Sequence, residues 1–565
     1  MRNQKINLFV VFALVLSFVA TSCSKKMNPL DSSLFTANPS PLELVGTKVP
    51  VTVNGRFPAK WFDKKATVVI TPVLKYNGGE AVGTSFTYQG EKVSGNGITI
   101  NQESGGAITL ASEFAYIPAM KKSDLCLRFA ISRNGKTITG FPDLKIADGV
   151  VATAAWADPK TVNPALAPDA FQRIIKEAHD AEILFLIQRA ELRSSELNSS
   201  NLAAWKDLVK EAEDNDRKNL NVEVAAYASP DGGYKLNEGL AENRERNTSS
   251  YLKREFKKNK IDTEINAKYT AQDWDGFQKL VQASSLQDKD LVLRVLSMYS
   301  DAERREQEIK NISAVYSELA ETILPKLRRS RLIANVEIIG KTDQELVTAA
   351  TSSAINDLNV EEMLYAATLD GTSKETVYTK VTEKFPNDYR GWNNLGDVFY
   401  AKGDFSKASQ LYSKAAQVSS RASEPNMNLA LISMIEGNDS KAEQLLGSAA
   451  GANTLNEALG VLYIKKGDYA KAAQAFGETK SNNAALAQIL TKNYNKAQQT
   501  LNAVKTKDAT TSYLMAVVAA RTNNVSGVAS NLKTAIQNGV SASEIANDLD
   551  FARFLTNPDI ANMLR

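Results

Sequence analysis

A short motif recurs through the last third of the chain, and it constrains the fold more than any other sequence feature. In each copy a Gly or Asn in a polar turn comes four or five residues before the Ala of a Lys-Ala pair. We call these alanines the marker alanines; they are Ala408, Ala442, Ala472 and, in a weaker copy, Ala497. Successive marker alanines are 34, 30 and 25 residues apart. Repeats of this length form helical hairpins, and each hairpin buries one face only against the next copy. The pattern therefore predicts a stacked helical array with a concave groove.

The first copy carries small and large residues at fixed places. Its signature positions and their later counterparts are Trp392, Leu395, Gly396, Phe399, Ala408, Tyr412, Ala415, Ala442, Gly460, Tyr463 and Ala472. The order of Trp, Leu-Gly, a large residue, Ala, an aromatic residue and Ala resembles the tetratricopeptide repeat (TPR). The resemblance covers residues 355–565 and implies an all-α solenoid that binds a protein partner in its groove. The alternative is an array that serves only as a spacer or a packing surface.

Residues 42–158 have a period of two instead. The strand-like segments are 49–53, 66–70, 84–88, 97–100, 107–110, 125–132 and 136–139. Turn-forming pairs such as Asn77-Gly78 and Asn134-Gly135 separate them. Seven or more short strands with turns between them predict an antiparallel β-sandwich. Such a module acts as a spacer or a recognition domain, and the sequence favours neither.

The stretch 160–345 mixes strand and helix patterns. Residues 222–227 predict a strand, 228–233 a tight Gly-rich turn, and a helix beginning at Asn237 carries Arg244. This order resembles the OmpA-like domain, a peptidoglycan-binding fold. The family's first, third and last strands have counterparts at 183–187, 263–269 and 328–339. A helical insert typical of Bacteroidetes members lies at 273–327. The resemblance implies an α+β domain between the sandwich and the repeats.

The OmpA-like family binds diaminopimelate with a charged pair. An Asp of the turn takes the ligand's ammonium, and the helix Arg, fifteen positions later, takes its carboxylate in a bidentate contact. Arg244 and Asn237 match the family, but Ser229 stands where the Asp is expected, and Asp231 is the nearest carboxylate that could replace it. Loss of that charge-assisted bond costs about 1.5–3 kcal/mol, a tenfold or larger loss of affinity.

These four residues also have structural interpretations. The sequence Asp231-Gly232-Gly233 is ordinary turn chemistry. Arg244 can equally cap the edge of the sheet or pair with a neighbour. The peptidoglycan-binding candidates Ser229, Asp231, Asn237 and Arg244 therefore form a hypothesis that geometry must test.

The N-terminus predicts export. Residues 1–5 carry positive charge, residues 6–20 are an apolar run too short to span a bilayer stably, and small residues lead directly to Cys23. The segment resembles a lipoprotein signal peptide, which implies that residues 1–22 are removed and that Cys23 receives the lipid. Residues 23–41 then form a tether. An ordinary signal peptide with an incidental cysteine is the alternative.

The predicted anchor also predicts a location. Several acyl chains on one cysteine attach a protein to a membrane effectively stably. No second run of ~20 apolar residues follows, so the lipid is the only membrane attachment that we expect. The residues after Cys23 are Ser24-Lys25-Lys26. They lack the Asp that retains lipoproteins at the inner membrane and the acidic residues of surface-exposed Bacteroidetes lipoproteins, which favours the periplasmic face of the outer membrane.

Cysteine and histidine are scarce. The chain has two cysteines. With Cys23 lipidated, Cys126 has no internal partner, and its alternating neighbours predict a buried core thiol. The single histidine, His179, is expected on a helix as a surface or cap residue. Because metal sites and acid–base catalysis rely on histidine, we expect neither a metal nor a cofactor.

No motif of a common enzyme class is present. The chain lacks a phosphate-binding loop ending in Gly-Lys-Ser/Thr and a Gly-x-Ser-x-Gly elbow. The pairs Asp273/Asp275 and Glu361/Glu362 are predicted to be solvated helix starts rather than catalytic carboxylates. The formal net charge of +3 on 565 residues gives no reason to expect nucleic acid. We therefore expect a binding protein rather than an enzyme.

Two functions follow from these predictions. The first is an outer-membrane lipoprotein that acts as an envelope scaffold, binding peptidoglycan through its OmpA-like domain and a protein partner through its repeats. The second is an accessory subunit of an envelope secretion or surface-assembly complex that no longer binds peptidoglycan. Arg244 and Asn237 favour the first function, and Ser229 favours the second.

Overall fold

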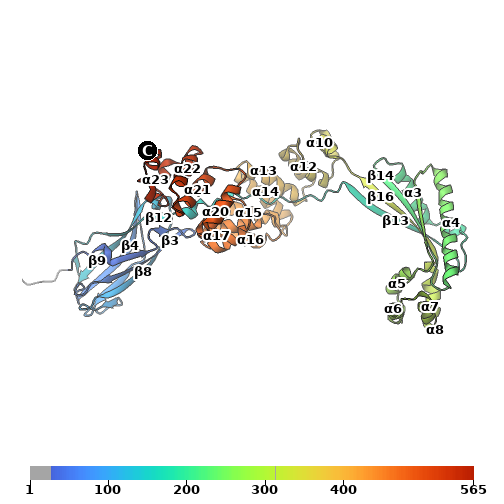
Figure 1. The fold of residues 1–565 in the computed structure, drawn as a ribbon, viewed down its shortest axis with the longest axis horizontal. Coiled ribbons are helices and arrows are strands. Elements are labelled where there is room, and N and C mark those ends of the chain that lie inside the picture. The colour runs from blue at the N-terminus through green and yellow to red at the C-terminus, as the bar shows by residue number, and fades with distance from the viewer. Residues whose placement is uncertain (1–26, 312, 565) are drawn as a thin grey trace, which may run out of the picture. The chain divides into compact units, whose positions relative to one another are not determined.

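The computed structural model describes residues 27–311 and 313–564, which form two compact units (Figure 1). Unit 1 contains the chain up to Pro168 and from Thr382 onwards, and unit 2 is Asp169–Val381. Unit 2 is thus inserted into the sequence of unit 1. The predicted signal peptide and Cys23 lie outside the described residues. Within the described residues, no helix has the length and apolar character needed to cross a membrane.

The N-terminal part of unit 1 is built from two facing sheets. One sheet has the order β1-β3-β8, with β1 (Phe35–Asn38), β3 (Lys48–Phe57) and β8 (Gly106–Ala115). The other has the order β10-β9-β4-β6-β7, with β11 beside β9 and β5 beside β4. Its strands are β4 (Ala66–Tyr76), β5 (Gly79–Val82), β6 (Phe86–Gly90), β7 (Ile98–Ile100), β9 (Ser123–Arg133), β10 (Lys136–Ile138) and β11 (Leu144–Asp148). Each predicted strand segment overlaps one of these strands.

The pairing departs from the antiparallel prediction in two places. Strand β7 pairs with β6 in parallel, and β12 (Val150–Val151) pairs in parallel with β2 (Leu42–Glu43). The first pair is joined by a loop long enough to return the chain to the same end of the sheet. The second brings together residues more than a hundred positions apart. Neither pairing leaves a mark on the local period-two pattern, which is the same for both strand directions.

Alternating side chains form the sandwich core. Along β8 every second residue is buried. The two sheets meet through aromatic contacts, with ring centroids 6.1 Å apart for Phe35 and Phe129 and 5.5 Å apart for Phe57 and Tyr88. Cys126 on β9 is 5% exposed and has no disulfide partner among the described residues, as predicted for a core thiol. Burial raises the pKa of this thiol.

The C-terminal part of unit 1 is an array of helical hairpins. The paired helices are α13 (Tyr389–Ala401) with α14 (Phe405–Val418), α15 (Ser423–Ile435) with α16 (Asp439–Gly447), α17 (Leu455–Lys466) with α18 (Tyr469–Phe476), α19 (Asn482–Leu490) with α20 (Tyr494–Ala503), and α21 (Ala509–Arg521) with α22 (Val525–Gln537). The helices α23 (Ala542–Ala546) and α24 (Pro558–Met563) follow. Helical repeats are therefore present where the motif predicted them.

The recurring motif builds the turn inside each hairpin. In the first hairpin Gly403 takes a positive φ of 78°, which L side chains rarely adopt. Asp404 then caps α14, because its side chain accepts a hydrogen bond from the backbone N–H of Lys407. Asp468 caps α18 in the same way. The Gly-Asp pair thus ends one helix and starts the next.

The signature residues let the two helices of a hairpin approach closely. A Cβ atom on Gly396 would lie 2.5 Å from the Tyr412 ring, and one on Gly460 would lie 2.5 Å from the Phe476 ring. The marker alanines and Ala415 have no exposed surface. Residues 355–381 belong to unit 2, whereas the TPR-like stretch was predicted to begin at 355.

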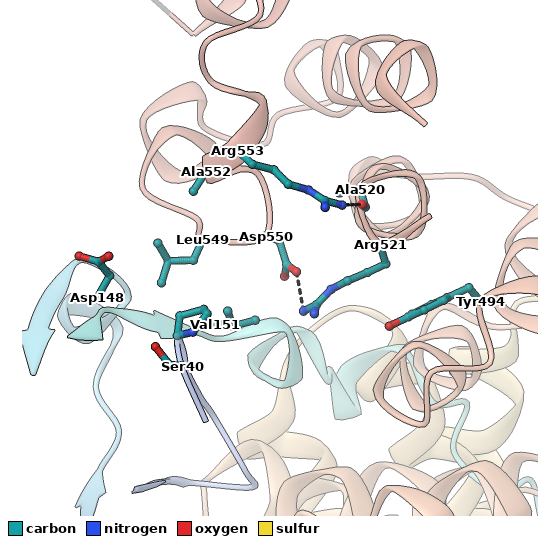
Figure 2. A pocket seen from close by; sticks show the side chains of 11 residues that line it. Ser40, Asp148, Val151, Tyr494, Ala520, Arg521, Leu549, Asp550, Ala552 and Arg553 are labelled. Atoms are coloured by element: carbon teal, nitrogen blue, oxygen red, sulfur yellow. Dashed lines mark hydrogen bonds and ion pairs between the residues drawn. The ribbon is translucent and has the colours of Figure 1, made fainter. Parts of the chain in front are cut away.

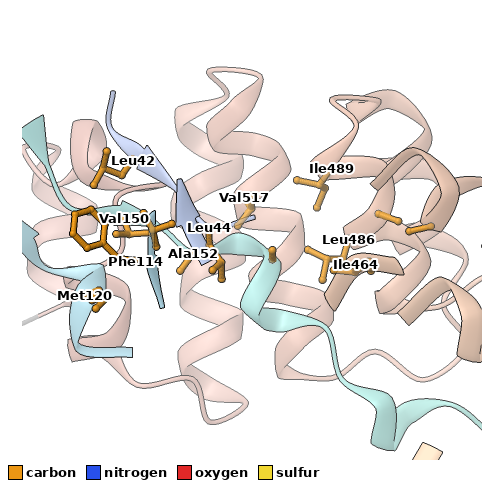
Figure 3. Packing of buried hydrophobic residues seen from close by; sticks show 14 of the residues in the cluster. Leu42, Leu44, Phe114, Met120, Val150, Ala152, Ile464, Leu486, Ile489 and Val517 are labelled. Carbon is orange, nitrogen blue, oxygen red and sulfur yellow. The ribbon is translucent and has the colours of Figure 1, made fainter. Parts of the chain in front are cut away.

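The sandwich and the array share one hydrophobic core (Figure 3). Buried residues from the sandwich side are Leu42, Leu44, Phe114, Met120, Val150 and Ala152, and those from the array are Ile464, Leu486, Ile489 and Val517. The contact is close, since a Cβ on Gly46 would lie 2.8 Å from the carbonyl oxygen of Lys465. Unit 1 is therefore a single packed body in which the array serves as a packing surface.

Unit 2 is a four-stranded sheet covered on one face by helices. The strand order is β13-β16-β14-β15, and only the β14–β15 pair is parallel. The strands are β13 (Ile174–Leu184), β14 (Lys218–Tyr227), β15 (Ile265–Thr270) and β16 (Arg329–Ile339), and the principal helices are α3 (Ser200–Glu213) and α4 (Tyr234–Asn259). Side chains of α3 and α4 pack on the buried face of the sheet. The other face carries cross-strand ion pairs such as Lys176–Glu337 at 2.9 Å.

Shorter helices complete unit 2. Residues between β15 and β16 form a helical subdomain with its own core, comprising α5 (Trp274–Ala283), α6 (Lys289–Met298), α7 (Ala302–Asn311), α8 (Ser313–Thr322) and α9 (Leu324–Leu327). This is the place of the predicted insert. The remaining helices are α2 (Ser194–Leu197), α10 (Asp343–Ala350), α11 (Val360–Ala366) and α12 (Lys374–Lys384), of which the last crosses the unit boundary.

Two local predictions in unit 2 are wrong. His179 lies within strand β13, not on a helix, and its imidazole is partly exposed beside Glu177 at 3.0 Å. The polar composition of that stretch predicted a surface helix. An edge strand has the same composition when, as in β13, most of its residues are exposed. Asp273 does start a helix, as its N-cap, but it is 5% exposed and pairs with Arg329 at 3.0 Å. Glu362, in a capping box, is likewise buried.

Candidate functional site

The groove of the array is filled by a segment of the chain itself. After β12 the chain makes a short 3₁₀ turn (Thr153–Trp156) and then runs through the groove to Pro168. Pro168 is the last residue of unit 1 before unit 2 begins. We call residues 156–168 the strap. At its start the ring of Trp156 stacks on Tyr513 of α21, with centroids 4.0 Å apart. At its end Arg390 of α13 donates a hydrogen bond of 3.4 Å to the Pro168 carbonyl. The strap thus passes from the last hairpin to the first.

Three asparagines hold the strap by its backbone. Asn394 accepts a hydrogen bond from the N–H of Ala167 and donates one to its carbonyl, both at 2.9 Å. Asn428 binds both backbone groups of Ala165, at 2.6 and 3.0 Å. Asn483 binds both groups of Asp158, at 3.0 and 2.9 Å. We call Asn394, Asn428 and Asn483 the asparagine ladder, and each of them a rung.

The rungs occupy one position of the repeat. Each stands 14 residues before the marker alanine of its hairpin, Asn394 before Ala408, for example. The third hairpin has Ala458 at this position and makes no such contact. Between the strap residues that Asn483 and Asn428 bind, the strap forms a 3₁₀ turn at Pro159–Thr161. This regular spacing was present in the sequence and was missed, because the TPR signature concerns packing positions and not groove positions.

Further contacts bury the strap. Tyr400 donates a hydrogen bond of 3.0 Å to the Pro159 carbonyl, and Asn393 donates one of 2.9 Å to the Ala165 carbonyl. Val162, Ala165 and Ala167 are at most 2% exposed. The site therefore binds an extended backbone and admits only small side chains at Ala165 and Ala167. Partner binding was predicted for this groove, and in the structure the chain's own strap occupies it.

One carboxyl group of the array, that of Glu457, has no partner among the described residues. Glu457 lies 15 residues before Ala472, the place that Asn393 has before Ala408. It is partly buried on α17, and its side-chain carboxyl makes no hydrogen bond or ion pair within the part of the chain that the structure describes. Burial raises the pKa of this carboxyl.

A polar network lies at the root of the strap, and Figure 2 shows its Asp550–Arg521 pair. Thr153 donates a hydrogen bond of 2.5 Å to the Asp550 carboxylate, which pairs with Arg521 at 2.6 Å. Asp548 accepts a hydrogen bond from Tyr513. Burial raises the pKa of Asp550. The network borders an open cavity of about 580 Å³, into which Arg521 and Leu549 point.

In unit 2 the predicted ligand residues of the turn are brought together. The side-chain amide of Asn237 donates hydrogen bonds to the carbonyls of Ser229 at 3.0 Å and of Gly232 at 2.7 Å. Ser229 donates to the Asp231 carboxylate. Asn237 thus shapes the turn before α4. That helix begins at Tyr234, three residues earlier than predicted.

Arg244 is turned inward. Each of its three guanidinium nitrogens donates to a backbone carbonyl, to Arg189 at 3.0 Å, Tyr227 at 2.8 Å and Leu186 at 3.3 Å. The residue is 1% exposed and lies 5.0 Å over the Phe185 ring. Burial lowers the pKa of Arg244 to about 10. Arg244 therefore joins the end of β14 to the loop after β13, and its guanidinium has a structural role in the fold.

Asp231 has a different partner. Arg328, directly before β16, pairs with Asp231 at 2.9 Å and donates a hydrogen bond of 3.2 Å to the Ser229 hydroxyl. Both side chains are nearly buried, at 10% and 13% exposure. Trp274, Ile309 and Tyr316 of the helical subdomain line the crevice above Asp231. Arg328 was not among the predicted site residues, although the Arg-rich start of the last strand was visible in the sequence.

Comparisons with known proteins give no family. No protein-family model matches the chain, and no curated protein matches it. Solved structures that match include one titled for Pseudomonas aeruginosa pilF, at 17% identity over 38% of this chain and 98% of that chain, with a TM-score of 0.27. A tetratricopeptide repeat protein from Parabacteroides merdae matches at 12% identity over 51% of this chain and 98% of that chain, with a TM-score of 0.25.

A third match is YrrB, described as a TPR protein with an unusual peptide-binding site. It is 15% identical over 33% of this chain and 88% of that chain, with a TM-score of 0.21. Scores this low carry no argument about function. The assignment of helical repeats in this protein therefore rests on its own hairpins.

Proposed function

We propose that this protein is a lipid-anchored scaffold of the bacterial envelope, an accessory subunit of a secretion or surface-assembly complex that does not bind peptidoglycan. Its N-terminal signal and Cys23 support anchoring in the outer membrane, on the periplasmic side. Unit 1 supplies a rigid body of sandwich and helical repeats for protein partners, a common use of such solenoids. Unit 2 is OmpA-like in this proposal, and no catalytic role is included.

The observation that carries the choice is the bonding of Arg244. A ligand carboxylate needs a guanidinium edge that faces solvent. The three nitrogens of Arg244 already donate to the carbonyls of Arg189, Tyr227 and Leu186. A stem peptide would have to break these bonds in a site with 1% exposure. Leaving buried carbonyls without donors costs about 1–3 kcal/mol each, which opposes binding.

The acidic half of the clamp is equally engaged. The family's mechanism needs a carboxylate available to the ligand's ammonium. Asp231 is paired with Arg328 at 2.9 Å, and Trp274 and Tyr316 line the crevice above it. A cationic ligand would meet the Arg328 guanidinium beside the Asp231 carboxylate, which reduces its attraction to this carboxylate.

Co-sedimentation with purified diaminopimelate-type sacculi tests the proposal. The whole chain with Cys23→Ser is the sample, since it avoids membrane carry-over. We expect the pellet to contain no more of this protein than of an unrelated soluble protein. Retention that is lost in Arg244→Lys and in Asp231→Asn, but kept in the exposed control Arg246→Lys, would replace this proposal with a peptidoglycan anchor.

The scaffold and anchor have their own tests. Fractionation of cells should find the wild type in the outer membrane and Cys23→Ser in the soluble fraction. Cross-linking in cells, followed by purification, should give a complex of constant composition whose formation requires the array. Equal soluble release of the two proteins would refute the lipid anchor, and a protein that purifies alone would refute the accessory-subunit role.

A further inference from the structure

One edge of the sandwich is long and unpaired. Strand β8 pairs with β3 along the whole of Gly106–Ala115, and it pairs with no other strand of the described residues. The opposite edge of the same sheet, β1, is short, and Pro39 and Pro41 follow it. Short strands, prolines and lysines protect a sheet edge from pairing with another chain. Strand β8 spans 10 residues and contains neither proline nor lysine.

Alternate residues of β8 direct their backbone groups away from β3. Just after β8, the N–H of Tyr116 donates a hydrogen bond of 3.0 Å to the Thr47 carbonyl. In an antiparallel pair every second residue bonds to the same neighbour, so the even-numbered residues of β8 bond to β3. Pro50, which has no N–H, stands opposite Glu113, as this phase requires. The intervening residues, whose backbone groups have no partner among residues 27–311 and 313–564, are Ala107, Thr109, Ala111, Glu113 and Ala115.

We call these five residues the open edge. Their side chains are exposed on the outer face of the sheet, whereas the side chains between them are buried in the sandwich core, except at Gly106. Three of the five are alanines, and the one charged residue, Glu113, pairs with Lys48 of β3 at 2.5 Å. The open edge therefore has neither the bulk nor the unpaired charge that would repel an approaching strand.

The core beside the open edge is incomplete. Ile100 on β7 is 3% exposed, and a Cβ on Gly106, at the start of β8, would lie 2.9 Å from its side chain. Ile98 is two residues earlier on β7, so its side chain lies on the same inner face. It is nevertheless 59% exposed, because the three-stranded sheet ends at β8. An inward apolar side chain of one further strand would cover it.

A cation lies near the same end of β8. Arg56 of β3 stands opposite Ala107, and its exposed guanidinium donates a hydrogen bond of 3.3 Å to the Ser104 carbonyl. It makes no ion pair with any carboxylate that the structure describes. Because Ala107 is small, the long side chain of Arg56 can reach across it to an acidic residue on the outer face of an added strand.

We propose that the open edge of β8 binds an extended segment of a partner protein as a further strand of the sheet. Unpaired backbone groups at a sheet edge select an extended chain, and the flanking side chains select its sequence. The segment has an apolar residue directed at Ile98 and an acidic residue on the outer face near Arg56. This surface adds a docking site to the proposed scaffold and does not depend on the lipid anchor.

A second copy of this chain is a poorer occupant. Ile108, Leu110 and Phe114, which point inward from β8, are at most 4% exposed within their own sandwich. A β8 from a second copy therefore has no inward apolar surface left to cover Ile98. A strand with no sheet behind it has that surface free, so the geometry favours a separate partner segment.

Residue-resolved hydrogen exchange of the whole chain with Cys23→Ser tests the open edge. The probe is a synthetic peptide of about nine residues that alternates valine with threonine and has one glutamate among the threonines. At millimolar probe, we expect the N–H groups of Thr109, Ala111 and Glu113 to exchange about tenfold more slowly than without it. The N–H of Leu110, which bonds to β3, should be slow in both states and serves as the internal control.

Two substitutions test the backbone bonds and the charge. Ala111→Pro removes one outward N–H and leaves the bonds to β3, so we expect probe binding to weaken about tenfold while Leu110 stays protected. Arg56→Glu should weaken binding of the glutamate probe, and strengthen binding of a probe with lysine in its place, by about twofold to fivefold. Lys136→Glu, at an exposed position of β10, is the matched control and should change neither affinity.

Three outcomes would overturn the proposal. Equal exchange of the open edge with and without the probe would mean that β8 does not accept a strand. Undiminished binding to Ala111→Pro would mean that the peptide adheres elsewhere. Protection of the open edge in the chain alone, lost on dilution to a monomer, would assign this edge to a second copy. All three results are independent of membrane anchoring and of sacculus binding, so they leave the proposed function untouched.

Discussion

The groove of unit 1 and the turn of unit 2 were both predicted to bind a ligand, and both are filled by the chain itself. In the groove, neutral asparagine amides bind backbone groups of a segment far away in sequence, with 263 positions between Ala165 and Asn428. In the turn, charged groups are neutralised by neighbours, as Asp231 is by Arg328. The same residue types that recognise a ligand also satisfy a fold, and only their partners distinguish the two uses.

The two regions differ in what their bonds cost. A neutral amide that is buried with both of its groups bonded leaves no charge in the interior. Arg244 carries a charge into a site with 1% exposure and donates its hydrogen bonds to neutral carbonyls, and burial lowers its pKa. We therefore expect the charged region to be the more sensitive to substitution.

Removal of Arg244 should have the largest effect. Arg244→Met keeps the bulk over Phe185 but leaves three buried carbonyls without donors, so unit 2 should lose about 3–5 kcal/mol of unfolding free energy. Urea unfolding, followed separately for the two units by hydrogen exchange, measures the loss. The exposed Arg246→Met on the same helix is the control, with an effect within about 0.5 kcal/mol. A loss as small as that for Arg244→Met would show that its charge is dispensable to the fold.

Removal of a rung should rank second. Asn428→Ala leaves the buried N–H of Ala165 without an acceptor, while its carbonyl keeps the bond from Asn393 at 2.9 Å. Unit 1 should lose about 2 kcal/mol, with unit 2 unaffected. Hydrogen exchange at Ala165 and tryptic cleavage after Lys160 are direct measurements of strap opening. Asn502→Ala, at an exposed position of α20, is the control. Equal protection of the Ala165 N–H against exchange in the two variants would contradict the role of the rung.

Close packing inside a hairpin should give a similar or smaller effect. Gly396→Ala forces a Cβ to within 2.5 Å of the Tyr412 ring, and overpacking costs about 1–3 kcal/mol. Gly447→Ala at the end of α16 meets nothing within 4 Å and should be neutral or slightly stabilising. Thermal unfolding of the two variants compares them. Equal midpoints would place the two helices farther apart than in the structure.

The smallest expected effect is on the pH dependence of stability. It arises in the third hairpin, which has no rung. Burial raises the pKa of Glu457, so ionisation of this carboxyl weakens the fold. Its favourable contribution is complete below the ordinary value of 4.5 and is lost as pH rises through the raised value. Glu457→Gln should therefore match the wild type in acid and be slightly more stable at neutral pH. A neutral-pH loss of stability in this variant would reveal a favourable partner of the carboxylate.

Local patterns predicted much of this fold. The period-two segments located the sandwich strands, and the Gly-Asp motif located the hairpin turns because Gly permits a positive φ and Asp caps the next helix. They failed at β13, where an exposed edge strand carries the polar composition of a surface helix. They also missed the parallel β2–β12 pair, because strand direction leaves the side-chain period unchanged.

The sequence by itself determined the elements, their burial pattern and the residues able to bind a ligand, including asparagines 14 positions before three marker alanines. Only the tertiary structure decided what those residues bind. Asn428 meets Ala165, and Arg244 meets the carbonyl of Leu186, because chain segments far apart in sequence pack together. A hydrogen-bond donor carries no record of its acceptor in its local sequence. Its partner is chosen by long-range packing, which no local period encodes.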